Sequence, residues 1–287
     1  MDNIVNFSST KEEAIKGRIC SVVSPILRFQ NKAYDLLVSK GILKRDSRFD
    51  TIKEFKDKHF GNRVFIVATG PSLTTEDLNK LKKEYTISMN SIVKMFNKID
   101  FRPTYYVISD GVVFRKIPHA SLFLPPERVF IGIGNVKTKW NINVTDVTGP
   151  ENEHVNLFPV DRIHTLKYLY YRKNQFNTRF SFDAEKAVID GGTITYCAIQ
   201  LAVYMGFKEI YLLGVDCNYT GLQAHFGESG NSLMKQGEMT AAFAAFQQQK
   251  AYECAYEALE GTDISIYNAT RGGKLEVFKR VDFDLLF

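Results

Sequence analysis

The stretch AVIDGGTITYCAIQLAVYMGFKEIYLLGVDCNY, residues 187–219, decides the fold. Small residues at 190–193 precede a segment whose apolar side chains recur every 3.6 residues, which predicts a helix. Gly206 stands where a left-handed residue ends such a helix. The apolar run 210–213 is typical of a buried strand and leads into the polar segment 214–219. We therefore predict a turn–helix–strand unit with polar groups at both ends. A plain structural unit without a ligand is the alternative reading.

A similar unit begins at residue 63 with RVFIVATGPSL. The continuous apolar run 64–67 suits an inner parallel strand, and the small residues 68–72 let a ligand approach the backbone. Thr74 and Asp77 then form a capping box for the next helix. This order is that of a Rossmann-type unit, although neither the GxGxxG nor the P-loop pattern is present.

Small or polar residues also follow three further predicted strands. The strand 86–89 precedes Asn90, 105–108 precedes Ser109 and Asp110, and 128–131 precedes a GIG run that we read as a turn. Because the carboxyl ends of parallel strands meet at one edge, we expect these residues to line a shared crevice. A long helix at 239–259 and a last strand at 264–267 complete the pattern. The fold class is α/β, with a Rossmann-like, mostly parallel sheet and helices on both faces.

The N-terminal part predicts a separate helical segment. A helix over about 12–39 is capped by the run 8–10, interrupted at Pro25 and ended by Gly41; a short helix at 52–59 follows. Its apolar stripe, with Lys and Arg nearby, packs on its own domain in the simplest reading, and a membrane surface or another subunit are alternatives. We divide the chain into a helical segment, 1–59, and a nucleotide-binding transferase domain, 60–287.

Composition limits the classes of function. A net charge of +5, from 37 basic and 32 acidic residues, fits a phosphorylated ligand or an anionic membrane but gives no argument for nucleic acid. The four cysteines lack CxxC spacing, so we expect no zinc ribbon or disulfide framework and a reducing, cytoplasmic location. No apolar run reaches about 18 residues, and the first residues lack signal-peptide features.

Among the histidines, His225 has the position best suited to catalysis, nine residues after Asp216 on a glycine-containing loop, 220–228, where we expect a lid. An imidazole there suits a general base, and a loop histidine without a role is the alternative. Asp110 and Asp216 are read either as ligands of magnesium or ribose hydroxyls or as helix caps. Arg271 and Lys274 are read as phosphate contacts or as solvated side chains, and the DFD run 282–284 as an accidental match to a metal-binding motif. We therefore predict no metal site.

Four short motifs, in this order and spacing, resemble a known bacterial family. They are ATGPSL (68–73), MNS (89–91), GGT (191–193) and GVDCNYTG (214–221). The chain is similar over about 60–270 to the DUF115, or 6-hydroxymethylpterin-diphosphokinase-like, family of surface-glycan gene clusters. More distantly it resembles the CMP-sialic-acid-dependent sialyltransferases of glycosyltransferase family 42.

The resemblance implies a set of site residues. It places Gly70, Pro71 and Ser72 at a phosphate or ribose, and Asn90, Ser109 and Asp110 near the nucleotide. Gly192 and Thr193 would begin the helix that faces the base and phosphate, Asp216 would face the donor sugar, and His225 resembles the catalytic histidine. Two positions depart from the sialyltransferase pattern. Thr69 replaces an Asn, and Asn218 stands where a phosphate-binding Tyr is expected, with Tyr219 beside it as a substitute.

The resulting expectation is a glycosyltransferase-like enzyme of surface-polysaccharide biosynthesis. It would move a sugar from a nucleotide donor, a CMP-sugar being favoured, to a glycan, a lipid-linked acceptor or another hydroxyl. His225 would remove the acceptor proton while Thr193 and Tyr219 stabilise the departing phosphate, with no cofactor. The first alternative is pyrophosphoryl transfer from ATP to a pterin-like alcohol, with magnesium held by Asp110 and Asp216. The second is a non-catalytic nucleotide- or glycan-binding module. Peripheral contact with the inner face of a membrane and a homo-oligomer stay open, and no nucleic acid is expected.

Overall fold

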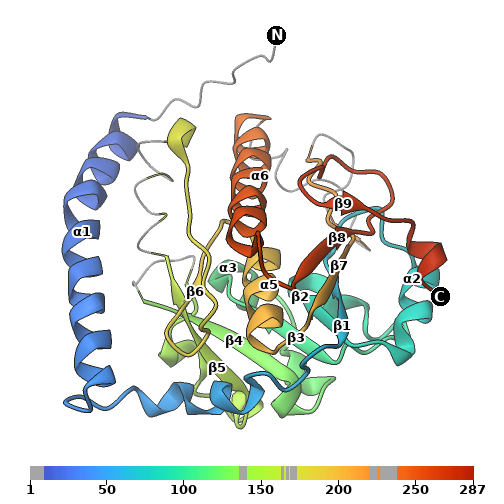
Figure 1. Ribbon diagram of the computed structural model, residues 1–287, viewed down its shortest axis with the longest axis horizontal. Helices are drawn as coiled ribbons and strands as arrows, with labels where there is room; N and C mark the ends of the chain where they lie inside the picture. Colours follow the sequence, from blue (N-terminus) through green and yellow to red (C-terminus); the bar gives the residue numbers. More distant parts are fainter. Residues whose placement is uncertain are drawn as a thin grey trace.

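Nine strands form one sheet in the part of the chain that the computed structural model describes, which is residues 10–135, 141–162, 165, 168, 173–219, 225–226 and 238–287. Every neighbouring pair is parallel, so all carboxyl ends lie at one edge (Figure 1). This confirms the predicted α/β class. The strands are β1 (Arg63–Val67), β2 (Thr86–Met89), β3 (Tyr105–Ile108), β4 (Val129–Gly134), β5 (Asn156–Asp161), β6 (Val188–Ile189), β7 (Glu209–Leu213), β8 (Ser265–Asn268) and β9 (Lys279–Arg280).

The strand order contains a topological switch point between β1 and β7. In space the order is β6-β5-β4-β3-β2-β1-β7-β8-β9, so the chain first builds outward from β1 to β6 and then returns to build the other way from β7. Val67, the last residue of β1, pairs with Leu213, the last residue of β7. In open α/β sheets, ligands bind outside the carboxyl ends of the strands at such a point.

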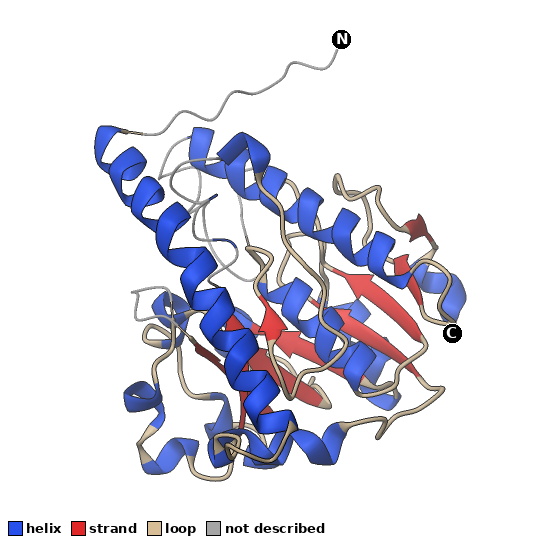
Figure 2. Ribbon diagram, turned by 60° about the vertical axis from the view of Figure 1, so that its left-hand side comes forward, coloured by secondary structure: helices blue, strands red, loops and turns tan. Residues whose placement is uncertain are grey.

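Helices cover both faces of this sheet (Figure 2). Alternate residues of β1 point to opposite faces: Val64 and Ile66 belong to the core under α5 and α6, whereas Phe65 and Val67 belong to the core that contains Leu78 of α2. Burial on both faces explains why the inner strands read as continuous apolar runs. The α-helices are α1 (Lys11–Ser39), α2 (Thr75–Lys80), α3 (Gly111–Phe114), α5 (Ile194–Tyr204) and α6 (Glu238–Leu259).

The α5 unit forms as its sequence predicts. Thr193 is the N-cap and its side chain accepts a hydrogen bond from the Thr195 amide. The helix is almost wholly buried, and Gly206, with φ +87°, follows its C-cap and donates to the Val203 carbonyl. Only a residue that tolerates a left-handed backbone ends a helix this way without strain.

The N-terminal segment differs from the prediction in two details. α1 starts with a capping box between Thr10 and Glu13 and continues through Pro25, which lies inside the helix rather than interrupting it. Pro25 has no backbone N–H and so removes one helical hydrogen bond, but the helix continues on both sides of it. Instead of a short helix at 52–59, a 3₁₀ helix spans Ser47–Phe55 after an Asp46 cap. The division of the chain at residue 59 stays a prediction.

One turn prediction was wrong, and three strands were missed. Gly132, Ile133 and Gly134 are not a turn; they extend β4 and pair with β5. A Cβ on Gly132 would lie 2.6 Å from Val160 Cγ2, so the glycine serves strand packing. The missed strands are β5, β6 and β9. β5 ends at Asp161, and most of the next ten residues lie outside the described residues. Between β4 and β5 lie the 3₁₀ helices Val144–Val147 and Pro150–Asn152.

Among the described helices, none combines the length and the apolar character needed to cross a bilayer.

Candidate nucleotide site

The sequence-predicted residues follow the carboxyl ends of five different strands. Because all the strands are parallel, the residues lie along one edge of the sheet. They are Gly70, Pro71 and Ser72 after β1, Asn90 after β2, Ser109 and Asp110 after β3, Gly192 and Thr193 after β6, and Asp216, Asn218 and Tyr219 after β7. Their roles toward a nucleotide stay predictions.

The loops after β1 and β7 contact each other at the switch point. The Gly70 amide donates to the Gly214 carbonyl at 2.8 Å, and Ser72 Oγ donates to Asp216 Oδ2 at 2.8 Å. A Cβ on Gly70 would overlap the Gly214 carbonyl oxygen and come within 2.8 Å of Asp216 Cγ. The position therefore requires glycine for close packing of the two loops, and the same lack of a side chain leaves the backbone accessible to a ligand.

Asp216 is held from two sides. Its carbonyl oxygen accepts from the Lys274 amide at 2.7 Å, which brings the loop after β8 against the loop after β7. Burial raises the pKa of the Asp216 carboxyl, and the hydrogen bond from Ser72 partly offsets this rise. A carboxyl in this setting can accept a hydrogen bond from a ribose or sugar hydroxyl.

His225 lies beside the β1 loop. Its Nδ1 is 3.3 Å from Thr69 Oγ1, and the amide of Phe226 donates to the Thr69 carbonyl at 2.6 Å. These two contacts hold the imidazole against Thr69, the residue that precedes Gly70, although Thr69 and His225 are 156 residues apart in sequence. The rest of the predicted lid, residues 220–224 and 227–228, lies outside the described residues.

Two glutamines of α6, which sequence reasoning missed, connect the loop after β7 to the start of α5. Gln248 donates to the Tyr219 hydroxyl and accepts from Cys217 Sγ. Gln247, only 8% exposed, lies against Gly192, and its Nε2 is buried without a partner. An unsatisfied buried amide is costly unless a ligand completes it, so Gln247 joins the candidate site. Burial also raises the pKa of Tyr219, which therefore stays a neutral phenol.

Arg162, after β5, is a second missed residue. Its guanidinium donates to the Ser109 carbonyl at 2.9 Å and lies 3.6 Å from Asp190 Oδ2, while its Nε is buried without a partner. Asp190 in turn accepts from the Gly192 amide at 3.0 Å. Arg162 thus links the end of β3 to the turn before α5. Arg162 is the first residue after β5, so a correct strand prediction at 156–161 would have pointed to it as a candidate site residue.

Asp110 has a local structural task. Its Oδ1 accepts from the amides of Val112 and Val113 and so caps α3. Between Asp110 and Asp216 lie three strand spacings, from β3 through β2 and β1 to β7, or about 14 Å. A shared magnesium ion at Asp110 and Asp216 stays a prediction. Within the described ranges, no group of three or more His, Cys, Asp or Glu is arranged to hold a metal.

Asn90 has an unusual backbone. Its φ is +48°, its carbonyl accepts from the Tyr106 hydroxyl at 2.8 Å, and its Oδ1 is buried without a partner. Met89, the residue before it, receives a contact from Thr195 Oγ1 at 3.5 Å. The end of β2, which Asn90 follows, therefore lies close to the start of α5.

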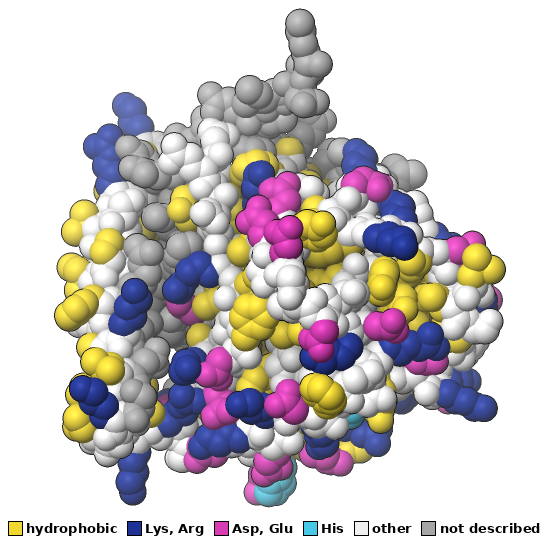
Figure 3. Space-filling model, viewed as in Figure 1, with side chains coloured by type: hydrophobic (Ala, Val, Ile, Leu, Met, Phe, Trp, Pro, Cys, Tyr) yellow, Lys and Arg dark blue, Asp and Glu magenta, His cyan; other side chains and the backbone are white. Residues whose placement is uncertain are grey.

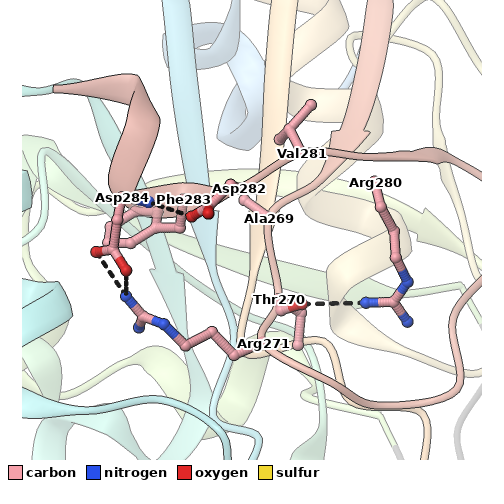
Figure 4. Close-up of a pocket in the computed structure, with 8 residues that line it drawn as sticks. All are labelled: Ala269, Thr270, Arg271, Arg280, Val281, Asp282, Phe283 and Asp284. Carbon is pink, nitrogen blue, oxygen red and sulfur yellow. Dashed lines mark hydrogen bonds and ion pairs between the residues drawn. The ribbon is translucent and has the colours of Figure 1, made fainter.

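Farther along the same edge, a pocket follows β8 and β9, and Figure 4 shows the residues that line it. Arg271 is one of them, and its guanidinium is already bound to Asp284 at 2.7 Å and to Asp77. The Arg271 guanidinium is therefore engaged by two carboxylates of the protein and is not merely solvated. Asp282 caps the last 3₁₀ helix and Asp284 also pairs with Lys80, so the DFD run has structural tasks.

Together these features define a Rossmann-like α/β protein with polar groups gathered around its switch point. The chain belongs to the 6-hydroxymethylpterin diphosphokinase MptE-like family, whose model matches residues 42–221. This confirms the family that the four motifs indicated. No curated protein matches the sequence significantly.

One similar solved structure is a Maf glycosyltransferase from Magnetospirillum magneticum AMB-1, with 15% sequence identity and a TM-score of 0.46. The similarity covers 83% of this chain and 38% of that protein, so this chain spans well under half of its length. A likeness of this degree bears on neither activity nor substrate.

Proposed function

We propose that the protein is a transferase that takes a sugar from a nucleotide-sugar, with a CMP-sugar preferred, and places it on a hydroxyl of a glycan or lipid-linked acceptor in bacterial surface-polysaccharide assembly. The observation that carries the proposal is the position of His225. Its imidazole is 3.3 Å from Thr69 within the β1 loop, at the switch point where the Gly70 backbone and the Asp216 carboxyl converge. An imidazole held at this edge can act as a general base toward an acceptor hydroxyl that binds beside it.

In the proposed reaction His225 Nδ1–H donates to Thr69 Oγ1, which leaves the lone pair on Nε2. Nε2 takes the acceptor's hydroxyl proton as that oxygen bonds to the donor sugar. The bond between the sugar and the phosphate oxygen breaks, and the nucleotide leaves with the electron pair. The start of α5 at Thr193, the Gln247 amide and the neutral Tyr219 phenol supply hydrogen-bond donors for the charge that develops.

The family description favours a second candidate, pyrophosphoryl transfer from ATP to a pterin-like alcohol. That reaction requires magnesium near the transferred phosphates. In this reaction Asp110 and Asp216 would hold the ion. Both carboxyls already accept hydrogen bonds within the protein, Asp110 from the amides of Val112 and Val113 and Asp216 from Ser72. Both candidates place a nucleotide at the switch point and differ in the donor and in the metal.

Donor hydrolysis and transfer test the role of His225. With CMP-N-acetylneuraminate as the probe donor, His225→Asn should lower the rate of CMP release by about 10²–10⁴-fold and leave CMP affinity nearly unchanged. His154→Asn is the matched control, because His154 is exposed and its φ of +68° suits Asn. A His225→Asn protein as active as the control contradicts the proposed base. If the native protein and the variant both bind CMP but neither turns over the donor, the function is that of a non-catalytic binding module.

A further inference from the structure

Helix α1 presents its apolar residues to solvent and its small residues to the protein. Its exposed side chains include Ile15, Ile19, Val22, Ile26, Phe29 and Leu36, each between 54% and 73% exposed. On the opposite side of the helix, Gly17 is buried and Ser24 is 2% exposed. A surface helix of a globular protein normally has the reverse orientation. The outward face is therefore free to contact something other than this chain's own core.

The six exposed residues, which we name the α1 stripe, recur every three or four positions except at Ala33. They form one continuous line about 30 Å long, since a helix rises about 1.5 Å per residue. Past the helix end, Ile42 and Leu43 are also exposed, at 65% and 42%. Figure 3 shows hydrophobic side chains along the left-hand edge of the molecule, over α1, interspersed with Lys and Arg. Contiguous apolar surface of this extent marks an interaction site.

The charges around the stripe are mostly basic. Lys11, Arg18, Lys32 and Lys40 are exposed on or next to α1. The two acidic residues of the first turn are occupied: Glu12 pairs with Lys16, and Glu13 faces the body of the protein, 3.3 Å from Lys173. An apolar line bordered by basic side chains complements an anionic lipid surface. The apolar side chains insert between the acyl chains, and the Lys and Arg side chains bind the anionic headgroups.

We propose that α1 lies flat on the surface of an anionic phospholipid bilayer and holds the protein there. This inference rests on α1 alone and does not depend on the proposed function. A second copy of the chain is the competing occupant. In a two-helix coiled coil the positions bordering the stripe would pair opposite charges between the helices. Here the charges on one border are Arg18 and Lys32, Glu12 and Lys16 on the other border already pair within α1, and Pro25 lies in the middle of the helix. The extension of the apolar line into the non-helical turn at Ile42 also suits a plane better than a helix.

Vesicle sedimentation with the full chain tests the proposal. The protein should sediment with vesicles of phosphatidylcholine and phosphatidylglycerol, at least about tenfold more than with phosphatidylcholine alone, and less at high salt because salt screens the cations. Ile19→Glu combined with Phe29→Glu should abolish binding, and Arg18→Glu combined with Lys32→Glu should weaken it at low salt. Leu122→Glu is the matched control, because Leu122 is 67% exposed and lies outside α1.

Unchanged melting temperatures will show that the variants fold, since all the substituted side chains are exposed. Two results would overturn the proposal. The first is a native protein that fails to bind vesicles and that light scattering shows to be a dimer without lipid. In that case the Ile19 and Phe29 substitutions would dissociate the dimer. The other is a native monomer that binds neither kind of vesicle.

Discussion

At the carboxyl edge of the sheet, the loops after β1 and β7 contrast with the loops after β4, β5 and β6. The first pair is held by backbone hydrogen bonds, such as Gly70 to Gly214, and by one carboxyl–hydroxyl contact. The other group is held by charged side chains: Arg179 contacts Asp161 at 3.0 Å, and Asn135 donates to Asp161 at 3.1 Å. Arg162 and Asp190 continue this network to the start of α5.

The difference separates two tasks. Small residues at the switch point leave backbone groups accessible to a ligand, whereas the charged network fixes where α5 begins. Phosphate binding needs both, because the helix start must face the loop at a fixed distance. Substitutions in the switch-point loops should therefore weaken ligand binding first, and substitutions in structural caps should lower stability first.

The largest effect on binding should come from Gly70→Ala. Its Cβ would overlap the Gly214 carbonyl, so the β1 loop must shift, and displacements of this kind cost about 10²-fold in affinity or rate. We expect CMP affinity, measured by calorimetry, to fall by about that factor. Gly261→Ala is the control, because a Cβ there meets nothing within 4 Å and the change adds only the cost of its positive φ. Equal CMP affinity in both variants would show that the β1 loop does not contact the nucleotide.

Gln247→Leu should separate binding from stability. Removing a buried amide with an unpaired Nε2 should leave the melting temperature of the free protein unchanged or raise it, while affinity for CMP falls about tenfold or more. Gln249→Leu, on the same helix, should alter neither. If the free Gln247→Leu protein melts at a clearly lower temperature and binds CMP normally, Gln247 is a packing residue.

Two substitutions of Asp110 test its helix-capping role separately from its negative charge. Asn caps helices about as well as Asp, so Asp110→Asn should keep stability, whereas Asp110→Ala should cost about 1 kcal/mol of unfolding free energy. We expect chemical denaturation to show this difference. A loss of CMP affinity in the Asn variant would instead support the nucleotide contact that the family resemblance implies.

The smallest effect should be that of Asp216→Asn on the pH dependence of stability. The folded protein raises the pKa of this carboxyl above its ordinary value of 3.8, so it binds more protons there than the unfolded chain. Its contribution to stability is complete below that value and is lost as pH rises through the folded pKa. The melting temperature of the variant relative to native protein should therefore increase from pH 4 to pH 7, by about 2–4 °C for each kcal/mol. A relative melting temperature that falls over this range contradicts the assigned direction.

The sequence predicts those elements whose signals are local. β1, β2, β3 and β7 are apolar runs, and α5 has its cap and its glycine stop within the stretch 187–219. β5 was missed because NLFPVD contains a proline and polar ends, and β6 and β9 because two residues carry no pattern. Those strands form only because neighbouring strands pair with them.

The residues of the candidate site also fall into those with a local sequence signal and those without one. Gly70, Thr193 and Asp216 are signalled by the strand ends and helix starts beside them. Arg162 and Gln247 are not, because their positions depend on contacts with segments far away in the chain. A single residue after an unrecognised strand, or one glutamine of a long helix, has no local signature of a ligand contact.

A thermal-shift panel of CMP, CDP, UDP, GDP and ATP, each with and without magnesium, tests the central claim most directly. Ligands that bind only the folded state raise its stability, by about 2.7 kcal/mol at a hundred times Kd. We predict that CMP stabilises native protein without magnesium and that Gly70→Ala reduces this effect. Stabilisation by ATP alone, and only with magnesium, would contradict the sugar-transfer proposal in favour of pyrophosphoryl transfer. No stabilisation by any of the five would contradict a nucleotide site between β1 and β7.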